Sequence, residues 1–298
     1  MKLQLCFSTC PNDTFVFDAM VHHKIDTEGL DFDIYMADVE ELNKHAFSAD
    51  ADVTKLSFNA YSQVSDKYMI LNSGSALGRK NGPLLVSKTK IYCDEVDELN
   101  IAIPGKNTTA AALLQILFPK VKKLREYLFS DIESAVLDSE VDAGVLIHEG
   151  RFTYKNKGLK LVADLGELWE TETHQPVPLG CIAIKRNLPA EIQQKFDAVL
   201  RKSVEFAMKN PNESLPFVRR HAKEMDDETM QKHINLFVND FTVNLDEKGK
   251  EAIEFFIEKL KLINASDEIC KPIFVKNLSR IKYLTKFNPM LIFSFLII

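Results

Sequence analysis

A single histidine follows a short apolar run near the middle of the chain. Residues 143–147 are uncharged and rich in β-branched and aliphatic side chains, which predicts a strand buried on both faces, and His148 comes directly after it. In open α/β sheets ligands bind beyond the carboxyl ends of strands, and histidine has the unperturbed pKa closest to neutral pH. His148 is therefore a candidate general base. The alternative is a hydrogen-bonded strand-end histidine with only a structural role.

A lysine and a serine mark a second strand end. Residues 52–55 predict a short strand that leads through Lys55 and Leu56 to Ser57, which can cap the next helix. A lysine and a hydroxyl at such a turn can hold a carboxylate, although a lysine there can also be simply solvated. This turn is a candidate anion site.

A third strand end lies at residues 100–103 and is followed by a predicted helix over residues 110–118. Thr108 or Thr109 is expected to cap this helix, whose free N–H groups and dipole favour an anion. Gly105 and Lys106 invite comparison with a nucleotide-binding P-loop. That motif is excluded, because its first glycine is absent and Asn107 replaces the required serine or threonine.

The loop after the first predicted strand, residues 2–8, is rich in turn-forming and helix-capping residues. Asn12 or Asp13 can cap a helix over residues 13–23. The loop is either a plain strand-to-helix turn or a place where backbone N–H groups and short polar side chains face the crevice. Asn12, Asp13 and Thr14 are accordingly candidate cleft-lining residues.

Alternating strand and helix patterns predict an α/β fold with two lobes and a substrate cleft between them. We expect the first lobe in residues 1–88, the second in 89–176, a helical return to the first lobe in 177–275, and a basic then apolar tail in 276–298. The charged residues 88–98 are interpreted as the first crossing, and residues 175–184 as the second. The tail could be an interaction segment, a segment packed on the body, or an extension without function.

Composition limits the classes of function. The 298 residues are 46% hydrophobic, with a formal net charge of -6 and basic residues spread along the chain. These values favour a globular protein that binds neither nucleic acid nor a membrane surface, and we expect no membrane insertion. The five cysteines form no CxxC pair, so neither a zinc site nor a disulfide framework is expected. Residues 1–7 lack the pattern of a secretory signal, which favours a cytoplasmic location.

Three stretches together are similar to a known family. Residues 8–18 (STCPNDTFVFD), 54–57 (TKLS) and 144–154 (GVLIHEGRFTY) resemble the 1,4-dihydroxy-6-naphthoate synthases, which act on cyclic dehypoxanthinyl futalosine in the futalosine route to menaquinone. The resemblance covers about residues 1–275. It implies a periplasmic-binding-protein-like fold of type II that serves as an enzyme, a carbon-carbon lyase.

The resemblance also implies the roles of particular residues. Neutral His148 would accept a proton, and a small carboxylate substrate would be held by Lys55, Leu56, Ser57, Thr109 and Ala110. No metal and no organic cofactor are implied. A positioned base typically contributes ~10²- to 10⁴-fold to the rate. The sequence leaves open the oligomeric state and the residue that orients His148, for which Glu149 is one candidate.

Two other functions share this expected fold. A chorismate dehydratase of the same pathway is the nearer rival, and in that family a histidine is not expected at the place of His148. A non-catalytic solute-binding protein would use the same cleft without chemistry, and it is expected to carry an export signal or a lipid-anchor cysteine. The segment 147–149 therefore favours the synthase.

Overall fold

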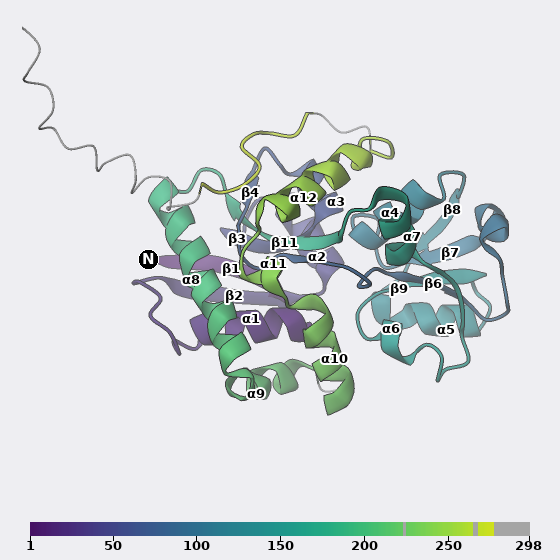
Figure 1. Ribbon diagram of the computed structural model, residues 1–298, viewed down its shortest axis with the longest axis horizontal. Helices are drawn as coiled ribbons and strands as arrows, with labels where there is room; N and C mark the ends of the chain where they lie inside the picture. Colours follow the sequence, from purple (N-terminus) through teal and green to yellow (C-terminus); the bar gives the residue numbers. More distant parts are fainter. Residues whose placement is uncertain (223–224, 265–267, 277–298) are drawn as a thin grey trace, which may run out of the picture.

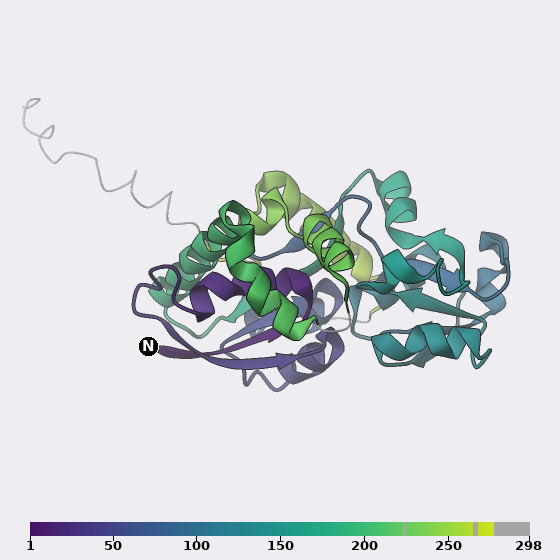
Figure 2. The ribbon, with the colours of Figure 1, turned by 90° about the horizontal axis from the view of Figure 1, so that it is seen from below.

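Two β-sheets, each flanked by helices, lie side by side in the computed structural model (Figure 1, Figure 2). The structure describes residues 1–222, 225–264 and 268–276. The predicted tail therefore lies outside the described residues, apart from Lys276. Within the described ranges, no helix is both long enough and apolar enough to cross a membrane.

The first sheet has the order β2-β1-β3-β11-β4, and β5 pairs with β11. Strands β1, β2 and β3 are parallel, whereas β11 runs antiparallel to β3, β4 and β5. This arrangement puts the carboxyl ends of β1 and β3 at one edge of the sheet. The strands are β1 (Lys2–Ser8), β2 (Asp31–Ala37), β3 (Val53–Ser57), β4 (Tyr68–Ile70), β5 (Ala76–Gly78) and β11 (Val177–Lys185).

The second sheet has the order β10-β6-β9-β7-β8. Its β7, β8 and β9 are parallel, and β6 is antiparallel to both β9 and β10. The strands are β6 (Leu84–Ser87), β7 (Asn100–Ile103), β8 (Lys123–Glu126), β9 (Ala143–Leu146) and β10 (Lys160–Asp164). The second lobe also holds α4 (Thr109–Leu117), α5 (Ile132–Leu137), α6 (Gly150–Thr153) and α7 (Leu165–Thr173).

The crossings between the sheets differ in one respect from the expectation. Strand β6 was expected to end the first lobe, but it pairs with β9 and β10 in the second sheet. The chain therefore crosses at residues 79–83, and the expected crossing contains instead a short 3₁₀ helix, Cys93–Glu98. A fully buried four-residue apolar strand fits either sheet, so its composition could not decide its partner. The second crossing lies at residues 174–176, at the start of the expected stretch 175–184, and the later residues of that stretch belong to β11 of the first sheet.

Helices cover the first sheet, most of them from the return part of the chain (Figure 1). After Pro189 the described part of the return segment is mostly helical, as its sequence predicts. Helices α8 and α9 pack on α1, and α10 reaches both α1 and β5. The helices are α1 (Pro11–Val21), α2 (Val39–Ala46), α3 (Phe58–Gln63), α8 (Ala190–Lys209), α9 (Pro211–His221), α10 (Asp227–Phe237), α11 (Asp240–Val243) and α12 (Glu247–Leu260).

The two lobes share a continuous hydrophobic core. Its cluster joins Leu56 and Tyr61 of the first lobe to Leu113 and Val145 of the second, and Trp169 of α7 packs edge-on against Phe256 of α12. Burial of this kind contributes roughly 25 cal/mol for each Å² of apolar surface removed from water. The shared core therefore fixes how the edges of the two sheets face each other.

Two glycines let the first crossing approach α7 closely. A Cβ atom added to Gly82 would lie 2.3 Å from the Cα of Gly166, which is a backbone atom that cannot rotate away. Gly82→Ala is therefore expected to lower the free energy of unfolding by about 1–3 kcal/mol, measured by urea denaturation. Gly150→Ala is the matched control, because its added Cβ would meet only ordinary contacts of 3.5 Å or more. Equal stability of the two variants would contradict this reading.

Candidate active site

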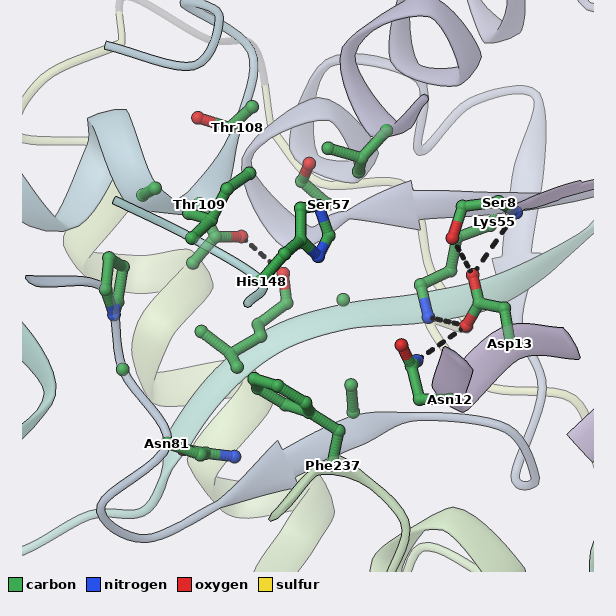
Figure 3. A pocket seen from close by; sticks show the side chains of 18 of the residues that line it. Ser8, Asn12, Asp13, Lys55, Ser57, Asn81, Thr108, Thr109, His148 and Phe237 are labelled. Atoms are coloured by element: carbon green, nitrogen blue, oxygen red, sulfur yellow. Dashed lines mark hydrogen bonds and ion pairs between the residues drawn. The ribbon is translucent and has the colours of Figure 1, made fainter. Parts of the chain in front are cut away.

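A cavity opens between the two lobes where the strand ends meet. It encloses an empty volume of about 730 Å³, part of which is open to solvent. Residues of both lobes line it (Figure 3). The sequence-predicted residues in its wall are Asn12, Asp13, Lys55, Leu56, Ser57, Thr109, Ala110 and His148. Thr14 is not in the wall, because its hydroxyl donates to the Cys10 carbonyl inside the first turn of α1.

The carboxylate of Asp13 is the centre of a buried polar cluster at the ends of β1 and β3. Lys55 Nζ lies 2.7 Å from one of its oxygens, and Ser8 Oγ donates to the other at 2.7 Å. The Asn12 amide also donates to it, at 2.8 Å, as the dashed lines in Figure 3 show. The ammonium of Lys55 keeps further N–H donors for a ligand, although its charge is already balanced by Asp13.

Ser57 and Thr109 lie at the other side of the cavity, where Thr109 connects the two lobes. The Thr109 hydroxyl donates to the Leu179 carbonyl at 2.7 Å and accepts from the Phe58 N–H at 3.1 Å. Ser57 Oγ accepts from Asn43 at 2.7 Å. Thr108, rather than Thr109, caps α4 through its side chain, accepting from Ala111 N. The helix start lies at the cavity as expected, and ligand binding by these residues stays a prediction.

His148 follows the buried strand β9 in a left-handed backbone conformation, with φ of 53°. This region costs a residue other than glycine on the order of 1–3 kcal/mol, and such strain is concentrated at functional sites. The ring is held between the lobes: Cys10 Sγ lies 3.4 Å from its Nδ1, and Phe129 contacts it edge-on with ring centroids 5.0 Å apart. The strain and these contacts aim the imidazole at the cavity.

The pKa of His148 results from opposing effects. Burial by itself lowers this pKa, but the contact with Cys10, followed by the carboxylates of Glu149 and Asp13, raises it to about 9. At pH 7 about one molecule in a hundred would then carry the neutral ring, since each unit of pKa is a factor of ten. The neutral imidazole expected from the sequence is therefore the minor form of the free protein.

Three residues of the site were not singled out by the sequence. Cys10 is the polar partner of His148, and no spacing links two residues that lie 138 positions apart. Arg151 lines the cavity, pairs with Asp164 and donates to the Gly82 carbonyl in the first crossing. His233 comes from α10, where its place on the apolar face beside Met230 and Phe237 was a usable signal of burial.

In residues 1–222, 225–264 and 268–276, no group of three His, Cys, Asp or Glu side chains is arranged to hold a metal ion. What the cavity does offer is an imidazole, two paired cations (Lys55 and Arg151) and a helix N-terminus. This set can bind a carboxylate and move a proton.

Comparison with known proteins gives one consistent result. The profile of the family described as "Menaquinone biosynthesis" matches residues 3–261. A 1,4-dihydroxy-6-naphthoate synthase of Thermus thermophilus is 38% identical over 273 residues, which cover 92% of this chain and 99% of the relative. A 1,4-dihydroxy-6-naphthoate synthase of Streptomyces coelicolor is 39% identical over 256 residues, with 84% and 90% covered.

Solved structures agree with the fold. A crystal structure of an Archaeoglobus fulgidus protein superimposes with a TM-score of 0.83 at 38% identity, covering 88% of this chain and 97% of that one. An alkanesulfonate-binding protein of Xanthomonas axonopodis pv. citri gives 0.68 at 11% identity, covering 92% and 97%. A Candida albicans protein with the generic periplasmic binding protein fold gives 0.67 at 10% identity, covering 90% and 92%. The two sheets thus form a periplasmic-binding-protein-like fold, as expected.

Proposed function

Because this chain belongs to the 1,4-dihydroxy-6-naphthoate synthase family, lyases of menaquinone biosynthesis, we propose that it converts cyclic dehypoxanthinyl futalosine to 1,4-dihydroxy-6-naphthoate with His148 as the proton acceptor. The observation that carries the proposal is the position of His148. Its imidazole stands in the wall of the interlobe cavity together with Lys55 and Arg151, two cations suited to a carboxylate.

The proposed reaction begins with proton transfer. The neutral ring of His148 removes a proton from a carbon next to a carbonyl group, and the negative charge passes onto the carbonyl oxygen. Ring opening and cleavage of a carbon-carbon bond follow in a retro-aldol sense, and formation of the aromatic naphthoate draws the reaction forward. Lys55 and the start of α4 would bind the substrate carboxylate or the enolate charge. Cys10 supports the base by contacting the imidazole.

Incubation of the purified protein with candidate substrates tests the function. We expect cyclic dehypoxanthinyl futalosine to yield 1,4-dihydroxy-6-naphthoate on chromatography, and chorismate in a parallel reaction to remain unchanged. Dehydration of chorismate would instead identify the rival enzyme of the same pathway. Binding of the cyclic compound without turnover would indicate a solute-binding protein.

The pH dependence of kcat/KM tests the role of His148 as a base. A base works only when neutral, and kcat/KM reports the pKa of the free enzyme. With a pKa of about 9, we expect kcat/KM to rise about tenfold per pH unit below pH 9 and to level off above it. A profile recorded from pH 6 to 10 measures this. A plateau already reached at pH 7 would contradict the raised pKa.

Cys10→Ala supplies the matched comparison for that profile. Burial lowers the pKa of His148 and Cys10 raises it, so loss of the thiol is expected to move the rising limb to lower pH. The height of the plateau can change as well, because the imidazole loses a contact that holds it in place. Cys93→Ala, at an exposed cysteine outside the cavity, should leave the limb unmoved.

A further inference from the structure

His233 is a buried histidine with no hydrogen-bond partner among the described residues. Its side chain is fully buried in α10, it lines the same cavity as His148, and neither Nδ1 nor Nε2 finds a partner in the part of the chain that the structure describes. Buried polar groups in native proteins are nearly always paired, and each exception needs an explanation. A leucine or phenylalanine would cover this face of α10 without that cost.

The neighbours of His233 favour an uncharged ring. It lies roughly parallel to the His148 ring, with centroids 6.0 Å apart, and it packs against Phe237 at 4.6 Å. Burial, followed by the charges of His148 and Lys55, holds its pKa well below the usual value. A neutral imidazole carries one N–H donor and one acceptor nitrogen, so it can donate to or accept from a hydroxyl and can donate to a carbonyl oxygen.

Asn81 is a second unpartnered polar group in the wall of the cavity. It lies in the first crossing with only 2% of its surface exposed, and among the described residues neither its amide oxygen nor its amide nitrogen has a partner. Figure 3 shows it on the Phe237 side of the cavity, away from the pair of Lys55 and Asp13. Two unpartnered neutral groups thus face a cavity in which Lys55 and Arg151 are each paired with a carboxylate.

We propose that His233 and Asn81 form a neutral binding surface that takes hydroxyl or carbonyl oxygens of the substrate, while the cations of the cavity take its carboxylate. The proposal rests on the proposed function, because cyclic dehypoxanthinyl futalosine carries both kinds of group. This surface would contribute binding free energy because the substrate oxygens pair polar protein atoms that are otherwise buried and unsatisfied. Such a surface discriminates against analogues that lack the oxygen atoms, because their binding leaves the protein groups unpaired.

Substitution of His233 tests the proposal against a purely structural role. In His233→Phe the ring is kept and the nitrogens are lost, and we expect kcat/KM to fall by about 10- to 100-fold while the midpoint of thermal unfolding does not fall. His233→Gln, which restores an amide near the position of Nε2, should recover part of the loss. Asn81→Ala should lower kcat/KM in the same direction.

His45→Phe is the matched control, because His45 Nδ1 is also buried and unpartnered among the described residues but its side chain lies outside the cavity. It should leave kcat/KM unchanged. A His233→Phe enzyme with unchanged kcat and KM would overturn the proposal and leave the proposed function standing. If His233→Phe loses thermal stability and activity together, and His233→Gln restores neither, His233 has a structural role. That outcome would also overturn the proposal.

A readout that needs no turnover separates the two proposals. The protein has seven histidines, so a long-range ¹H–¹⁵N spectrum contains the ring-nitrogen signals of only seven side chains. The signals of His233 are assigned as those that are absent from the spectrum of His233→Phe. Titration with 1,4-dihydroxy-6-naphthoate, whose hydroxyl groups are neutral oxygens, should shift the His233 nitrogens. Unshifted nitrogens in a protein that binds the naphthoate would overturn the proposal, whether or not the cyclic substrate is converted.

Discussion

Replacing His148 by asparagine is expected to lower kcat/KM for the cyclic substrate by about 10²- to 10⁴-fold, which is the usual contribution of a positioned general base. Asparagine is the informative choice because it tolerates the left-handed backbone found at this position, whereas alanine there is strained. The variant loses the imidazole and keeps the turn after β9. Steady-state kinetics with measured product formation give the result.

Control variants distinguish loss of the general base from disruption of the turn after β9. Thermal unfolding of His148→Asn should stay close to that of the parent protein, and His148→Ala should be as inactive but less stable. His23→Asn is the matched histidine control, because His23 also has positive φ but lies on the surface, outside the cavity. Turnover of His148→Asn within a few-fold of the parent would remove His148 from the role of base.

Replacing Lys55 by methionine should cost stability as well as activity. The pair of Lys55 and Asp13 is almost fully buried, with 8% and 2% of the side chains exposed, so the variant leaves an unpaired carboxylate inside the protein. Removal of one partner of such a pair typically costs about 3–5 kcal/mol. We expect a loss of this size in the free energy of unfolding, measured by urea denaturation.

Two comparisons test the cause of that loss. Lys55→Met combined with Asp13→Asn removes both charges and should recover part of the stability, because the unpaired charge is gone. Lys202→Met breaks an exposed pair with Glu28, whose side chains are 48% and 37% exposed, and should cost less than about 1 kcal/mol. If Lys55→Met were as stable as Lys202→Met, the buried pair would not be a stabilising part of the site.

Much of the local structure could be predicted because its causes are local. The uncharged run before His148 forms the buried strand β9, and Thr108, one of the two expected caps, caps α4. The helical character of the return segment is also local, because α8 and α12 each carry an apolar face. Short elements such as β5 and α7 span too few residues for periodicity to mark them clearly.

The candidate site could be predicted only in part, because some of its features are local and others depend on contacts between distant segments. Strand ends and helix starts mark where ligand-facing residues lie, so Lys55, Ser57 and His148 could be predicted as residues of one cleft. Which side chains meet there depends on contacts between distant segments. Cys10 reaches His148 across the interlobe boundary, and His233 arrives on a helix that had no chemical motif.

The α/β class, most of the elements and the strand end that carries His148 could be predicted from the residues alone, because periodicity, capping and turn chemistry act over a few residues. Three features depend instead on the folded chain: β6 joins the second sheet, Asp13 balances the charge of Lys55, and two histidine rings lie roughly parallel in one cavity. These outcomes follow from strand pairing and packing between residues far apart in the chain. Spacing along the sequence carries no information about such contacts.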